Sequence, residues 1–213
     1  MSVFPANVFG PVIDGTGVEV AVRDTIDKWF LTYLREFEVQ AGLIPDHHAT
    51  PFHPLPKSFS VANNLDRSNT EALPSIVVVS PGTSDRIGPR MSGDGMFIVN
   101  YLIGVGCFVS APTRADTMKL VRVYTAICRT ILLHKQSLGG YASGSTWLDE
   151  SWDDDFTFTD DQTISVGQAV FEIEVAGVVS RYGGPDEPDG DDTVPGTWPV
   201  VEDVIAVIEM KED

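Results

Sequence analysis

The segment that most constrains the fold is residues 16–40, where large apolar side chains recur every three or four positions. At about 100° per residue, this spacing places them on one face of a helix. Thr16 and Glu19 have capping-box spacing at its start, and Gly42 and Pro45 end it. We expect so wide an aromatic face to pack on a sheet or another helix. Its members are Val18, Val22, Ile26, Trp29, Phe30, Tyr33 and Phe37.

A second helix is predicted over residues 113–135. Thr113 is a favourable N-cap, and Asp116 lies in the first turn, where a carboxylate is stabilising. The side chains that the helical spacing predicts as buried are Leu120, Tyr124, Ile127, Cys128 and Ile131. The basic side chains that fall on the opposite side, and that we expect to point outward, are Arg114, Lys119, Arg122 and Arg129.

The longest predicted strand is residues 96–110. Its odd positions form one continuous apolar face, from Phe97 to Val109. Gly104 and Gly106 lie on the even side, and a helix packed closely over them would explain two glycines in a strand. Further strands are predicted at residues 75–80, 147–149, 156–159 and 170–181. The proline-rich stretch 41–74 is predicted to be a loop that could contain a short strand near 58–61.

These elements predict an α+β fold: a mostly antiparallel sheet packed with two main helices, long loops and an extended C-terminal arm. We divide the chain into an N-terminal arm (1–15), a domain (16–182), an acidic linker (183–197) and a strand-like arm (198–213). Hydrophobic residues make up 43% of the chain, which is enough for a folded core.

The C-terminal arm is apolar although it follows an acidic linker. We expect it to dock as a strand on a sheet edge, in its own subunit or in a neighbour, and a short helix is the alternative. Its candidate contact residues are Val204, Ile205 and Ile208.

The chain is strongly acidic, with 14 Lys and Arg against 31 Asp and Glu and a net charge of −17. This charge repels phosphate backbones and argues against sequence-specific nucleic-acid binding. Residues 1–10 contain no basic side chain and no long apolar run, so we expect no signal peptide. No stretch approaches the ~20 apolar residues of a membrane span, so we expect no membrane contact and assembly in the cytoplasm.

No motif indicates catalysis, and we expect neither an enzyme nor a cofactor. His47, His48 and His53 are close in sequence, but adjacent histidines point apart and no cysteine joins them, so we expect no metal there. Cys107 and Cys128 lie in apolar runs and read as small buried residues. An acidic run could bind calcium, although EF-hand spacing is absent, and we expect a solvated or intersubunit face. Its candidate residues are Asp153, Asp154 and Asp155.

Three stretches resemble the tail terminator proteins of long-tailed bacteriophages, especially those that infect actinobacteria. They are V-E-V-A-V-R-D-T-I-D-K-W-F-L-T-Y-L (18–34), A-P-T-R-A-D-T-M-K-L-V-R-V-Y-T-A-I (111–127) and S-T-W-L-D-E-S-W (145–152). The resemblance implies an antiparallel sheet flanked by the two helices, in copies that form a ring, typically a hexamer. Such a ring caps the tail tube, ends its polymerisation and joins tail to head in the neck of the virion.

The resemblance also implies the partners: the tail tube subunit, a head-completion or neck protein, and DNA only as passing cargo. A ring requires each subunit to meet the next through unlike surfaces, and a basic helix facing an acidic loop would fix their orientation. We therefore expect Arg114, Lys119, Arg122 and Arg129 to face the acidic run of a neighbour. Two alternatives remain: another neck or connector subunit, and a calcium-dependent binding module.

Overall fold

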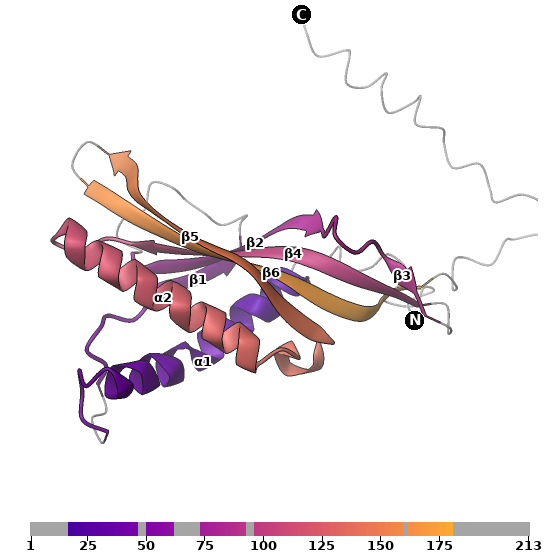
Figure 1. Cartoon of the computed structure of the whole chain (residues 1–213), viewed down its shortest axis with the longest axis horizontal. Coiled ribbons are helices and arrows are strands. Elements are labelled where there is room, and N and C mark those ends of the chain that lie inside the picture. Colours follow the sequence, from indigo (N-terminus) through magenta and orange to yellow (C-terminus); the bar gives the residue numbers. More distant parts are fainter. Residues whose placement is uncertain (1–16, 47–49, 62–72, 93–95, 160–161, 181–213) are drawn as a thin grey trace, which may run out of the picture. The chain divides into compact units, whose positions relative to one another are not determined.

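The computed structural model describes residues 17–46, 50–61, 73–92, 96–159 and 162–180. All of them belong to one compact unit, Ala6–Tyr182. The described elements confirm the α+β fold class, with two long helices and a sheet of six strands (Figure 1). In chain order they are α1 (Val18–Gln40), β1 (Ser58–Val61), β2 (Ser75–Thr83), β3 (Arg90–Met91), β4 (Met96–Val109), α2 (Arg114–His134), the 3-10 turn η3 (Leu138–Gly140), β5 (Gly144–Thr159) and β6 (Gln162–Ser180).

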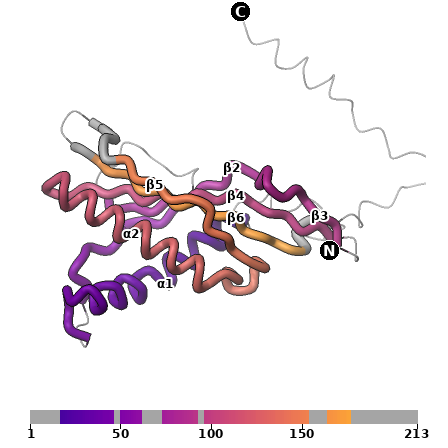
Figure 2. The backbone as a smooth tube through the Cα atoms, viewed as in Figure 1, coloured from indigo at the N-terminus to yellow at the C-terminus, as the bar shows by residue number. Residues whose placement is uncertain are grey.

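The strands lie in the order β1-β2-β4-β6-β5, and β3 pairs with β4. Every pairing is antiparallel except that of β1 with β2, so the sheet is mixed but mostly antiparallel. Figures 1 and 2 show both helices on the same face of this sheet. Helix α1 packs on β1 and β2, whereas α2 packs on β4, β6 and β5.

The sheet register puts one set of alternating side chains under the helices. In β4 the predicted odd positions face the core, and Ile103 pairs with Phe171 of β6 while Val105 pairs with Ala169, all four fully buried. Phe30 of α1 lies at the centre, where its ring meets Phe59 edge-on at 5.8 Å and Tyr124 at 5.2 Å. The alternation that the sequence predicted for these strands is therefore confirmed.

In α1 the buried face is narrower than predicted. Its deepest row follows steps of four: Val18, Val22, Ile26, Phe30, Leu34 and Glu38. Trp29, Tyr33 and Phe37 are only partly buried, because they line a groove of about 710 Å³ between α1 and α2 instead of facing the sheet. The predicted buried face of α2 is confirmed in all five positions.

Three local expectations need correction. The N-cap of α1 is Gly17 and not Thr16, which lies outside the described residues. Neither described helix packs over Gly104 or Gly106. A Cβ at Gly104 would lie 2.9 Å from the Gln168 amide, and a Cβ at Gly106 would lie 3.1 Å from the Phe108 ring. Both of these side chains are on the face of the sheet that the helices do not cover. The two strands predicted within 144–159 are one continuous strand, β5.

Other expectations are confirmed. The short strand near 58–61 is β1, and Thr113 caps α2 by accepting a hydrogen bond from the backbone N–H of Asp116 at 3.1 Å. None of the helices in the described part of the chain combines the length and apolar composition that crossing a membrane requires. The arms and linker at 1–15 and 183–213 lie outside the described residues.

Candidate assembly surface at two sheet edges

Strand β5 forms one edge of the described sheet and carries two exposed tryptophans. Trp147 is 43% exposed and Trp152 is 42% exposed. They are an odd number of residues apart, so regular alternation would place them on opposite faces. The register shifts between Trp147 and Asp149, which brings Trp147 opposite Phe171 and Trp152 opposite Gly167. This bulge therefore turns both indole rings toward the helix side of the sheet.

Helix α2 places one arginine over each of these rings. The Arg129 guanidinium lies 5.0 Å from the Trp147 ring centre, and that of Arg122 lies 5.5 Å from the ring centre of Trp152. Both distances are within the range of cation–π attraction, which contributes about 0.5–1 kcal/mol at exposed positions. We call Trp147, Trp152, Arg122 and Arg129 the tryptophan edge.

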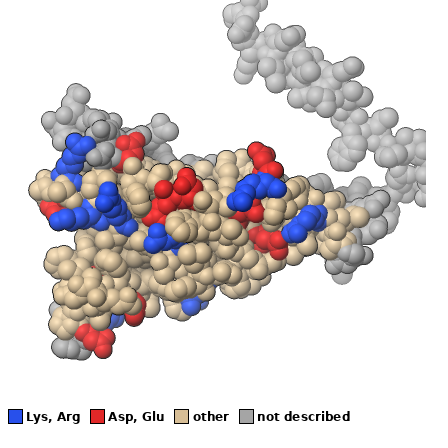
Figure 3. Space-filling model, in the orientation of Figure 1, with Lys and Arg blue, Asp and Glu red and all other residues tan. Residues whose placement is uncertain are grey.

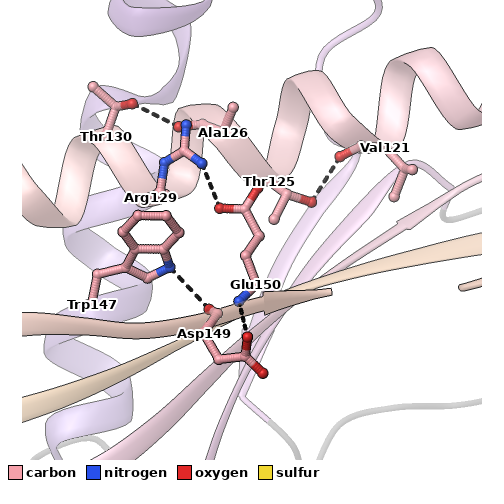
Figure 4. Close-up of polar contacts among 8 residues, drawn as sticks. All are labelled: Val121, Thr125, Ala126, Arg129, Thr130, Trp147, Asp149 and Glu150. Carbon is pink, nitrogen blue, oxygen red and sulfur yellow. Dashed lines mark hydrogen bonds and ion pairs between the residues drawn. The ribbon is translucent and has the colours of Figure 1, made fainter. Parts of the chain in front are cut away.

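Arg129 is also ion-paired within its own subunit. Its guanidinium donates to the carboxylate of Glu150 at 2.6 Å, and the Glu150 side chain is only 5% exposed. Figure 4 shows Arg129 reaching from α2 onto β5, beside Trp147, whose indole N–H donates to the Asp149 carbonyl at 2.9 Å. The expectation that Arg129 points outward is therefore wrong, because a buried carboxylate on β5 attracts it.

The other predicted contact residues divide into exposed and undescribed ones. Arg114, Lys119, Arg122 and Asp153 are exposed. In Figure 3 basic atoms gather at the left of the view, where α2 lies in Figure 1, and acidic atoms lie beside them.

The remaining predicted contact residues are not described. Asp154 and Asp155 belong to β5, but their side chains are outside the described part of the structure. Val204, Ile205 and Ile208 lie entirely outside it. Docking of the C-terminal arm stays a prediction.

A second exposed apolar surface precedes the opposite edge strand, β1. In the segment 50–57, Phe52 is 66% exposed and Leu55 is 42% exposed. The backbone beneath them is fixed by the fully buried carboxylate of Glu38, which accepts the N–H of Phe52 at 2.9 Å and that of His53 at 2.7 Å. Nδ1 of His53 lies 2.9 Å from the same carboxylate. We call this segment the proline loop.

Two further hydrogen bonds anchor the proline loop. The hydroxyl of Tyr124 in α2 donates to the Pro54 carbonyl, and the N–H of Lys57 donates to the Pro74 carbonyl at 2.7 Å. Burial raises the pKa of Tyr124, and the nearby Cys107 and Glu38 raise it further, so its hydroxyl keeps the proton that it donates. The sequence signal for this loop was its proline content, but nothing in the pattern predicted a buried Glu38.

Groups that could carry chemistry are sparse in the described part of the chain. It holds no group of three or more His, Cys, Asp and Glu side chains arranged for a metal ion. His53 is bonded to Glu38, while His47 and His48 lie outside the description. Cys107 and Cys128 are buried, and their sulfur atoms lie 3.8 Å apart. Burial raises the pKa of the Cys128 thiol, and the contact with Cys107 raises this pKa further. A protonated thiol is a poor nucleophile, so this pair fits the predicted packing role.

Comparison with known proteins adds no relative: no protein-family model and no curated protein matches the chain.

Proposed function

We propose that this chain is a structural subunit that assembles head to tail into a ring. The observation that carries the proposal is a pair of unlike exposed apolar surfaces in one subunit. The tryptophan edge lies at β5, and the proline loop leads into β1. Exposed Trp and Phe side chains are typical of the centres of protein–protein interfaces.

Unlike surfaces favour a closed ring over a two-fold dimer. A dimer with two-fold symmetry joins the same patch on both copies, whereas contact between different patches passes from each copy to the next. Such a series of contacts forms a closed ring when the rotation from each copy to the next returns to the first copy. The spatial separation of the two edges, with β2, β4 and β6 between them, suits this arrangement because one copy can hold both neighbours at once.

Within that class, we propose the tail terminator of a long-tailed bacteriophage. This step rests on the resemblance of residues 18–34, 111–127 and 145–152 to that family. The ring would cap the tail tube, end its polymerisation and join it to a head-completion protein. The net charge of −17 supports the passage of DNA through such a ring, since like charges keep DNA from adhering. Another subunit of the neck is the alternative within the same particle.

Electron microscopy of the purified protein, alone and mixed with tail tubes, tests the proposal. We expect rings of uniform diameter and a single ring at one end of each tube. Tubes that keep elongating from purified tube subunits in the presence of the protein would contradict a terminator. Rings that never bind a tube end would favour the neck subunit, and a protein that stays monomeric in every mixture would overturn assembly itself.

A further inference from the structure

The proline loop is built to present side chains. Its backbone is held by Glu38, Tyr124 and the Pro74 carbonyl, yet the side chains of Phe52 and Leu55 remain exposed. Ordering a loop against a partner normally lowers affinity, because its conformational freedom is lost on binding. Here that freedom is already lost in the folded subunit, so Phe52 and Leu55 can bind without this cost.

The composition of the loop specifies the surface that it fits. Pro51, Pro54 and Pro56 lie within six residues. Proline-rich extended segments are bound by surfaces lined with aromatic rings, because the segment is stiff and offers flat apolar faces. The exposed aromatic pair of the described chain that lies on a sheet edge is Trp147 and Trp152.

Charge also matches between the two surfaces. Residues 50–57 contain no carboxylate and end in Lys57, which is exposed. Residues 144–153 contain Asp149, Glu150 and Asp153 and no basic residue, so the surface around the two tryptophans has three carboxylates against the two guanidinium groups of Arg122 and Arg129. A net negative strand edge therefore meets a net positive loop, which favours this orientation over the contact of either surface with itself.

We propose that the proline loop of one copy binds the tryptophan edge of the next copy, with Phe52 and Leu55 against Trp147 and Trp152. This inference rests on the proposed ring and specifies its contact. A second copy is the occupant because every copy carries both surfaces, one on the edge strand β5 and the other in the segment that leads into the opposite edge strand, β1. In a ring, each subunit then uses its loop toward one neighbour and its β5 edge toward the other.

A directional cross-linking experiment tests this contact. Leu55→Cys and Ser151→Cys are prepared as two separate proteins, which leaves Phe52 and both tryptophans in place. Ser151 is exposed, lies between Glu150 and Trp152 on β5 and pairs with Gln168, so its side chain borders the proposed contact from the helix-free face of this edge strand. The native Cys107 and Cys128 are fully buried and should not react. The assembled mixture is treated with a bismaleimide long enough to pass around the edge strand and resolved by denaturing electrophoresis.

We expect a cross-linked dimer in the mixture and little from either single variant, because a head-to-tail contact brings position 55 near 151 but not near another 55. Equal cross-linking of Ser151→Cys alone would overturn the proposal in favour of edge-to-edge pairing. Rings in the micrographs without a cross-linked dimer would overturn this contact and leave the proposed function intact. Absence of any assembly by the parent protein would overturn both.

Single substitutions give an independent readout. We expect Phe52→Ala or Trp152→Ala to raise the Kd of assembly about tenfold or more, as for central aromatic contacts in interfaces. Leu31→Ala is the matched control, since Leu31 is 43% exposed but lies on α1. Thermal unfolding of each variant as a monomer shows whether the fold is retained. Equal effects on assembly from Leu31→Ala and Phe52→Ala would argue against a specific contact.

Discussion

The carboxylate of Glu38 lies 2.9 Å from Nδ1 of His53, across fifteen positions of sequence, and its side chain is fully excluded from solvent. Glu38 ends the row of apolar residues by which α1 packs on the sheet. A charge in such a place is tolerated only where hydrogen bonds compensate for lost hydration. The N–H groups of Phe52 and His53 supply two of them, so the helix end and the proline loop order each other.

Replacing this carboxylate should destabilise the fold. In Glu38→Ala the N–H groups of Phe52 and His53 lose their acceptor, and we expect the free energy of unfolding to fall by about 1–3 kcal/mol. Urea denaturation followed by circular dichroism measures this change. Glu36→Ala is the control, because Glu36 is exposed and its carboxylate accepts a hydrogen bond from the Gln40 side chain at the helix surface. Equal stability of the two variants would show that Glu38 does not anchor the loop.

Gly167 should resist substitution because α2 packs directly on it. A Cβ at this position would clash with Thr125 Oγ1 and lie 2.9 Å from Val121 Cγ2. We expect Gly167→Ala to lower the free energy of unfolding by about 1–3 kcal/mol through overpacking. Gly144→Ala in β5 should be nearly neutral, since nothing lies within 4 Å of its added Cβ. Calorimetric melting of both variants compares them, and similar melting temperatures would disprove the close approach of α2.

Substitution of Arg129 should change the stability of the fold, whereas substitution of Arg122 should change assembly. Arg129→Ala leaves the buried Glu150 carboxylate without its ion-pair partner, so we expect a loss of about 1–3 kcal/mol in stability. Arg122→Glu changes an exposed side chain and should leave melting nearly unchanged. Because it makes the tryptophan edge more negative toward the net positive proline loop, it should strengthen assembly at low salt, and this gain should diminish as salt is raised. Sedimentation across a salt series measures the effect, and weaker assembly at low salt would show instead that Arg122 faces an acidic surface of the neighbour.

Alkaline pH should destabilise the fold through Cys128. Burial raises the pKa of this thiol in the folded protein, whereas the unfolded chain releases its proton near pH 8.5. Above that pH the unfolded state binds fewer protons than the folded state, so stability must fall as pH rises. Melting temperatures should be flat near neutrality and decline above about pH 8.5. The decline should be shallower in Cys128→Ala than in the parent, and an identical slope would show that Cys128 does not contribute.

Most of the fold could be predicted from the periodicity of apolar residues. A helix buries one face at a spacing of about 3.6 residues and a strand at a spacing of two, so the pattern is visible in a short stretch of sequence. It placed both helices to within two residues and all five buried positions of α2. It missed the continuity of β5 through its acidic stretch, because pairing with β6 supplies hydrogen bonds that side-chain composition does not reveal.

The candidate surface depended on features that no repeat encodes. A bulge after Trp147 reverses the strand's alternation and brings Trp152 to the same face, and register shifts of this kind are fixed by the neighbouring strand. Arg129 looked exposed on a helical wheel, yet Glu150 on β5 draws it inward.

The sequence by itself determined the α+β class, the acidity and the apolar faces, since these depend on side chains close in the chain. Only the tertiary structure decided which charges are buried and which aromatic rings share a surface. Those properties depend on residues such as Glu38 and His53 that meet only after the chain has folded, when loss of water makes each hydrogen bond obligatory.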